Sequence, residues 1–119
     1  MRKNKDFNPN NCPVTACLNK IGGKWKTVVL LMINDNKNRF SILMRVIPTI
    51  SKQMLINQLR ELESDGLINR KVFAEVPPRV EYELTRYGKT TLPIIYEMGK
   101  WGKLDMDGDF FFRIENPLN

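Results

Sequence analysis

The side chains best suited to chemistry lie on one face of a helix that the sequence predicts over residues 51–65, called here the reading helix. Gln53, Asn57 and Arg60 share a face, because three or four residues make about one helical turn. The opposite face carries the apolar residues Leu55, Leu59 and Leu62. Asparagine and glutamine pair with adenine through two hydrogen bonds, and arginine pairs with guanine in the same way. The pattern therefore predicts a helix that reads bases in a DNA groove.

A solvated surface helix is the alternative interpretation of this stripe, since most helices of soluble proteins have one apolar and one polar face. The charge of the chain favours the first interpretation. Lysine and arginine number 19 against 13 acidic residues, which gives a net charge of +6 and a pI near 9.5. A basic chain suits a polyanionic partner. We therefore expect double-stranded DNA as the partner.

The sequence offers few residues for catalysis or metal binding. It contains no histidine, which excludes Ser-His-Asp and Cys-His nucleophile arrangements and the usual imidazole ligands of zinc. Two cysteines, Cys12 and Cys17, cannot by themselves complete a four-ligand zinc site. We expect no catalytic residue, no metal and no cofactor. A thiol-dependent enzyme built on Cys12 is the least favoured alternative.

Cys12 precedes Pro13 at the predicted start of the first helix. The unpaired amides of a helix N-terminus stabilise a thiolate, and Lys20 and Lys24 are near in sequence. Cys12 is therefore a candidate redox sensor, and a small packed side chain is the alternative. Cys17 is a poor partner for a disulfide, because five residues along a helix turn it to another face.

Local signals define both ends of the reading helix. Ser51 can supply the N-cap oxygen, and Gly66 stands where the chain must adopt a left-handed conformation. Pro48 separates the reading helix from a short helix over 42–46, for which Ser41 is the expected cap. A short helix, a turn and a longer helix are the order of a helix-turn-helix.

Two strands follow the reading helix, over residues 67–73 and 80–84, with turn residues at 76–79 between them. A helix-turn-helix followed by a hairpin predicts an α+β fold, the winged helix-turn-helix. Its basic residues have expected roles on DNA. Phosphate contacts are expected from Lys52, Arg70, Lys71 and the N-terminal arm, and a contact in the narrow minor groove from Arg79. Ser51, at the start of the reading helix, is also expected among the DNA-binding residues.

Further helices are predicted on both sides of this unit. A helix begins at Pro13 and ends before Gly22, and the apolar segment 24–33 is the expected core helix. Residues 34–38 form a loop by composition, and Arg39 and Phe40 are expected to form a short strand.

The C-terminal helical region runs from a cap at Thr85 toward Leu104, and Pro93 is expected to divide it. It contains more apolar side chains than one small core needs, including Ile95, Met98 and Trp101. We expect these three residues in a homodimer interface that joins additional N- and C-terminal helices. The alternative is that they cover the core of the monomer.

The domain organisation follows from composition. Residues 1–11 are expected to form a flexible basic arm, 12–104 the winged helix-turn-helix domain with its dimerisation helix, and 105–119 a tail. The longest apolar run, residues 28–33, is shorter than the ~18 residues that a membrane span needs. The charged start lacks the apolar segment of a signal peptide. We expect a cytoplasmic protein without membrane contact.

The chain closely resembles the HxlR-type family of bacterial winged-helix transcriptional regulators, relatives of the MarR group. The resemblance rests on Cys12-Pro13, Ile21-Gly22-Gly23-Lys24-Trp25, Arg39-Phe40-Ser41, Ile50-Ser51-Lys52-Gln53-Met54-Leu55, Leu59-Arg60-Glu61-Leu62-Glu63, Asp65-Gly66-Leu67-Ile68, Val76-Pro77-Pro78-Arg79-Val80-Glu81-Tyr82, Leu84-Thr85, Gly88 and Trp101-Gly102. It implies a homodimer, a recognition helix over 51–65 and a wing over 70–83. It also implies that Cys12 matches the cysteine with which some members sense oxidants or electrophiles. Some of these members use a second, C-terminal cysteine, and no cysteine follows Cys17 here.

The sequence thus predicts a sequence-specific DNA-binding transcriptional regulator, and repression is the favoured mode of action. A thiol signal or an unidentified small-molecule effector is the expected stimulus. Two alternatives belong to other classes. A winged-helix protein-interaction module would leave Gln53 and Asn57 freely replaceable. A thiol-dependent enzyme would depend on Cys12 and would tolerate loss of the polar stripe.

Overall fold

The reading helix is α4, Lys52–Ser64, and its apolar face lies in the centre of the core. Leu55, Leu59 and Leu62 are each at most 3% exposed, as the spacing of the leucines predicts. The Ser51 hydroxyl accepts a hydrogen bond from the Met54 amide at 3.0 Å, so the predicted N-cap is confirmed. At the other end, Gly66 has φ +76° and the Leu67 amide bonds back to the Leu62 carbonyl at 2.9 Å. This is the glycine-terminated helix end that the sequence predicts.

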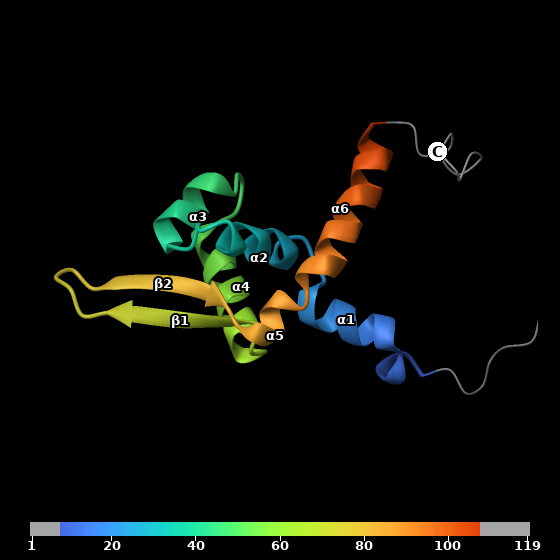
Figure 1. Ribbon diagram of the computed structural model, residues 1–119, viewed down its shortest axis with the longest axis horizontal. Helices are drawn as coiled ribbons and strands as arrows, with labels where there is room; N and C mark the ends of the chain where they lie inside the picture. The colour runs from blue at the N-terminus through green and yellow to red at the C-terminus, as the bar shows by residue number, and fades with distance from the viewer. Residues whose placement is uncertain (1–7, 108–119) are drawn as a thin grey trace, which may run out of the picture. The chain divides into compact units, whose positions relative to one another are not determined.

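The structure, a computed structural model, describes residues 8–107. The chain divides into two compact units, Met1–Lys89 and Thr90–Asn119 (Figure 1). The first unit contains the helices α1 to α5 and the hairpin, and the second contains α6. Within the described range, every helix is too short or too polar to cross a membrane.

Three helices precede α4. They are α1, Pro13–Ile21, α2, Lys26–Asn34, and α3, Phe40–Val46. The core helix α2 begins two residues later than expected and buries Val29, Leu30 and Ile33. Asn36 in the loop after α2 has φ 62°, a left-handed conformation that asparagine tolerates. Of the expected basic arm, residues 1–11, the structure describes 8–11, where Pro9–Asn11 form one turn of 3-10 helix before α1.

The start of α3 corrects two sequence expectations. The helix begins at Phe40, with Arg39 as its N-cap, so Ser41 lies inside the first turn and is not the cap. Arg39 and Phe40 accordingly form no strand. The neighbouring Asn38 carbonyl instead accepts a hydrogen bond from the Tyr82 amide of the hairpin at 2.9 Å, which ties the loop before α3 to the wing.

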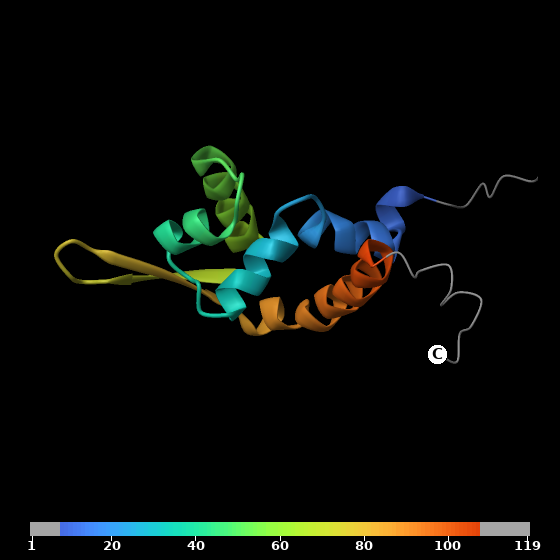
Figure 2. The same ribbon diagram turned by 90° about the horizontal axis from the view of Figure 1, so that it is seen from above.

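The wing is an antiparallel hairpin of β1, Ile68–Phe73, and β2, Arg79–Leu84. At its base, Ile68 pairs with Leu84 and both side chains are buried. The strands then project beyond the helices of their unit, and residues 74–78 form the exposed tip (Figure 1, Figure 2). Helix-turn-helix and hairpin together give the predicted winged helix.

The C-terminal region is divided, but not at Pro93. Helix α5, Arg86–Lys89, follows Thr85, whose hydroxyl accepts a hydrogen bond from the Gly88 amide at 2.9 Å. Helix α6, Leu92–Met106, starts after a break at Thr90 and Thr91. Pro93 lies in the first turn of α6, where its missing N–H is not needed, so it starts a helix instead of dividing one.

Candidate nucleic-acid interface

The predicted base-reading side chains all lie on the exposed face of α4. Gln53, Asn57 and Arg60 are exposed, and so is Lys52 at the start of the helix. The Gln53 side-chain amide donates to the Asn57 carbonyl oxygen at 2.9 Å, which holds the two amides side by side. Ser51 is exposed as well, and its oxygen is already the cap of α4. The hydroxyl hydrogen remains available for a phosphate oxygen.

The acidic residues of this region are confined to the second half of α4 and its end, and each forms an ion pair with a lysine or arginine from another element. Glu61 lies 3.8 Å from Lys26 Nζ, and Asp65 lies 3.3 Å from Lys20 Nζ. Glu63 lies 3.7 Å from Arg70 Nε. The first half of the helix, residues 52–58, contains no acid. An anion can therefore approach the N-terminal half of α4 without meeting a carboxylate of that half, and the helix dipole favours this approach.

Arg70 and Lys71 lie on opposite faces of the wing, because successive residues of a strand alternate. Arg70 faces the same side as its cross-strand partner Tyr82 and reaches Glu63 of α4. Lys71 lies on the other side and pairs with Glu83 at 3.1 Å. The two residues that the sequence groups together therefore point to different sides of the hairpin.

Arg79 is folded back onto the wing. Its guanidinium lies over the Phe73 ring, 4.1 Å from the ring centre, and Phe73 is its cross-strand partner. Arg79 Nε lies 3.6 Å from a Glu75 carboxylate oxygen and 3.4 Å from a Glu81 oxygen. The same Glu81 oxygen lies 3.4 Å from an Arg39 nitrogen. An extended contact of Arg79 in a minor groove would require its guanidinium to leave these carboxylates.

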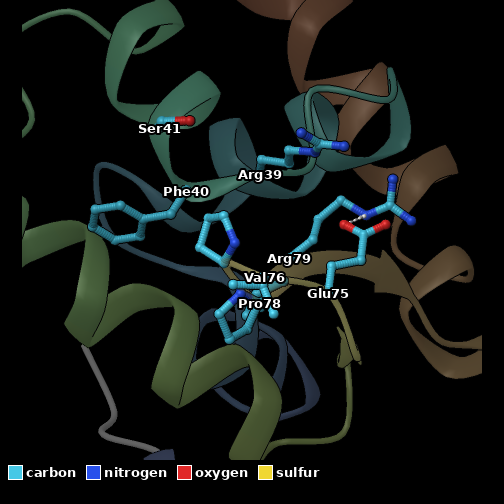
Figure 3. Close-up of a pocket in the computed structure, with 9 residues that line it drawn as sticks. Arg39, Phe40, Ser41, Glu75, Val76, Pro78 and Arg79 are labelled. Carbon is cyan, nitrogen blue, oxygen red and sulfur yellow. Dashed lines mark ion pairs between the residues drawn. The ribbon is translucent and has the colours of Figure 1, made fainter.

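Arg39, Glu75 and Arg79 border an open groove of about 550 Å³ between the start of α3 and the tip of the wing (Figure 3). Figure 3 shows Phe40 at one end and the two guanidiniums of Arg39 and Arg79 at the other. Arg39 did not appear among the sequence candidates. Its link to the wing depends on a carboxylate 42 residues away, and no local pattern indicates such a contact.

Cys12 is the N-cap of α1 and is half-buried, although its thiol makes no capping hydrogen bond of standard geometry. The amide and hydroxyl of Thr15 and the amide of Val14 point toward the sulfur and lower the pKa of the Cys12 thiol. Cys17 is also a half-buried free thiol. Residues 8–107 contain no group of three His, Cys, Asp or Glu side chains that could hold a metal ion.

The three residues expected at a dimer interface differ in exposure. Ile95 is only 4% exposed in the single chain, whereas Met98 is 43% and Trp101 56% exposed. Ile94, at 43% exposed, completes a stripe with Met98 and Trp101 at a spacing of four and three residues. The apolar surface that α6 leaves uncovered thus contains Ile94 in place of Ile95.

The model of the HxlR-like helix-turn-helix family matches residues 20–109. This segment includes α2 to α6 and therefore the whole helix-turn-helix and the wing. The chain belongs to the HxlR-like helix-turn-helix family. The resemblance inferred from the sequence is confirmed, and the chain is a helix-turn-helix transcriptional regulator of this family.

Two curated relatives show how far the similarity extends. The HTH-type transcriptional regulator YybR of Bacillus subtilis is 45% identical over 109 residues, which cover 90% of this chain and 87% of YybR. An HTH-type transcriptional regulator of Methanothermobacter thermautotrophicus is 55% identical over 93 residues, covering 78% of this chain and 71% of the relative. Both relatives are HTH-type transcriptional regulators.

A solved structure of the redox regulator HypR in its reduced form superposes on this HxlR-like chain with a TM-score of 0.76. It is 46% identical, and the match covers 81% of this chain and 95% of HypR. The superposition confirms the winged-helix architecture.

Proposed function

We propose that the chain binds operator DNA as a homodimer in the cytoplasm and represses transcription there. One observation carries the proposal: the exposed N-terminal half of α4 presents two amides and a lysine and contains no acid. This is the chemistry of base and phosphate recognition in a major groove. A dimer bound across a promoter would exclude polymerase.

In this proposal, Gln53, Asn57 and Arg60 read base edges. Ser51 and Lys52, at the N-terminus of α4, contact phosphates, where the helix dipole favours negative charge. Arg70 and Lys71 contact phosphates from the two sides of the wing. Arg79 reaches the minor groove after its guanidinium leaves the carboxylates of Glu75 and Glu81 for DNA phosphates.

The experiment that tests this function is selection of bound fragments from fragmented chromosomal DNA, followed by titration of the selected site and of random DNA at several salt concentrations. We expect a preference for the selected site of at least about 10³-fold. Affinity for both should fall as salt rises, with a log–log slope of about −0.9 per neutralised phosphate. Equal affinity for selected and random fragments would refute sequence-specific recognition, and salt-insensitive binding would argue for a protein-interaction module instead.

We also propose that oxidation or capping of the Cys12 thiol lowers operator affinity. The hydrogen-bond donors around Cys12 favour its thiolate, which is the form that reacts with oxidants. HypR, with a similar fold, is a redox regulator. The test treats the protein with a mild oxidant and measures operator release in the parent, in Cys12→Ser and in Cys17→Ser. Release that persists in Cys12→Ser would refute the role of Cys12.

A further inference from the structure

A second cavity, of about 190 Å³, opens between α4 and the base of the wing. Its apolar lining comes from Phe40, Ile56 and Leu59. Leu59 is only 3% exposed and belongs to the core, so the inner part of this cavity has a fixed apolar wall. The Phe40 ring and the branched side chains of Ile56 and Leu59 can cover the faces of a flat apolar group.

Four polar side chains complete the lining: Arg60 and Glu63 from α4, Arg70 from β1 and Tyr82 from β2. Arg70 and Tyr82 are cross-strand partners, which places their side chains on the same face of the hairpin. The backbone amide of Tyr82 donates a hydrogen bond to the Asn38 carbonyl, which fixes the position of this wall of the cavity through the backbone. The polar groups thus converge from two elements that the core holds together.

The charges of the cavity favour an anion. Two guanidiniums face one carboxylate, and the single ion pair among them is loose, with 3.7 Å between Arg70 Nε and a Glu63 oxygen. Arg60 forms no ion pair with any residue in the range 8–107. Burial raises the pKa of the Tyr82 phenol; Arg70 opposes this rise and Glu63 adds to it. The phenol therefore stays protonated at neutral pH and is a hydrogen-bond donor.

Size and lining together define the ligand. A cavity of about 150 Å³ can hold a benzene ring, and drug-sized ligands need roughly 300–1,000 Å³. The cavity has room for one ring and a small substituent. Inorganic phosphate or acetate would leave the apolar wall uncovered, and a neutral ring would leave the guanidiniums without an acceptor. A guanidinium fork matches the two oxygens of a carboxylate.

We propose that this cavity binds a single-ring aromatic carboxylate, with the ring between Phe40 and Ile56 and the carboxylate on Arg60 and Arg70. Arg60 lies at the border between the cavity and the base-reading stripe of α4, so a bound carboxylate withdraws its guanidinium from DNA. This second part rests on the proposed function. The ligand is then an effector that lowers operator affinity.

The first measurement needs no DNA. The full chain is titrated with benzoate, and binding is followed by calorimetry and by NMR shifts of amide signals of α4 and the wing. We expect saturable binding, with the largest shifts around Arg60 and Tyr82. Benzamide, which keeps the ring, and acetate, which keeps the charge, should each bind at least about 10-fold more weakly.

Variants separate this site from general attraction of anions. Arg60→Ala should weaken benzoate binding at least about 10-fold, because a charge-assisted contact is lost. Tyr82→Phe, which keeps the ring and removes only the hydroxyl, should weaken it by a smaller factor. Lys71→Ala is the matched control. It also removes one positive charge, but Lys71 lies on the face of β1 opposite to Arg70 and the cavity, so benzoate binding should remain unchanged.

The site is overturned if benzoate does not saturate, if acetate binds equally well, or if Arg60→Ala and Lys71→Ala behave alike. The effector role is tested last, with the selected operator fragment, where benzoate should lower affinity in the parent and not in Arg60→Ala. Benzoate that saturates the chain without changing operator affinity refutes the effector role alone. Failure to bind any operator refutes the proposed function and leaves the benzoate measurement valid.

Discussion

In the proposed function, single side chains on α4 read the base edges of DNA. Asn57→Ala removes one of the two adjacent amides, and Arg60→Ala removes the guanidinium. Each should cost about 1–3 kcal/mol of specific binding and should flatten the preference among bases. Titration of the selected site and of single-base variants measures both effects. Ser64→Ala, at the exposed C-terminal end of the same helix, is the control and should change neither.

The reactivity of Cys12 depends on the donors that surround its sulfur. Because these donors lower the pKa of the Cys12 thiol, the thiolate forms at lower pH than in an ordinary cysteine. In Cys17→Ser, the rate of alkylation should therefore reach half its plateau at a lower pH than the rate for an ordinary exposed cysteine does. Thr15→Val removes one donor and should move this midpoint upward. A midpoint at or above the ordinary value would remove the electrostatic basis of the sensor.

At the scale of the elements, the wing and the start of α3 are joined through Glu81. This carboxylate is shared by Arg39 and Arg79, so a DNA phosphate that approaches either guanidinium would compete with it. Glu81→Gln keeps the size of the side chain and removes its charge. We expect tighter DNA binding by about 0.2–1 kcal/mol, the typical strength of an exposed ion pair, and a steeper salt dependence. Glu97→Gln, in α6, is the matched control and should leave affinity unchanged.

Helix α5 and the base of the wing fit together at Gly88. A Cβ atom at this position would lie 1.9 Å from the Leu67 carbonyl oxygen, and the backbone there has little room to move. Gly88→Ala should lower the free energy of unfolding by at least about 1–3 kcal/mol. The same substitution at Gly99 of α6 meets no atom within 4 Å and should raise it by about 0.5–1 kcal/mol. Urea unfolding at one protein concentration measures both.

Elements whose limits are set by neighbouring residues could be predicted from the sequence. Ser51 and Gly66 limit α4 through bonds that span only a few residues, and the leucine spacing defines its buried face. The expected cap at Ser41 was wrong because a capping residue type also occurs inside first turns, and Arg39 occupies the cap position. Pro93 was misplaced for a similar reason, since proline both breaks helices and begins them.

The exposure of the candidate site was also predictable, but its charge pairing was not. The 3.6-residue period places Gln53, Asn57 and Arg60 on the outer face whatever the tertiary structure is. The partners of Arg70 and Arg79 depend on how the hairpin pairs and where it packs. The cavity beside Arg60 depends on the same packing, and the sequence gives no sign of it.

At the scale of the whole molecule, the uncovered apolar stripe of α6 should join two chains. Ile94, Met98 and Trp101 are each at least 43% exposed, and three such side chains on one helical face favour burial against a partner. Two linked reading helices bind two half-sites about 10–10.5 bp apart, or a multiple of this spacing. The second contact then benefits from a high effective concentration, which raises affinity by about 10²–10⁴-fold.

Met98→Glu places a charge in this stripe, and we expect it to convert a dimer of about twice 13.9 kDa into a monomer in sedimentation experiments. Operator affinity should fall at least about 10²-fold, while affinity for random DNA falls far less, because a single reading helix still contacts phosphates. Lys100→Ala changes an exposed residue off the stripe and should remain a dimer with parental affinity. A parent chain that sediments as a monomer at micromolar concentration, or a monomeric Met98→Glu with unchanged operator affinity, would show that recognition needs only one reading helix.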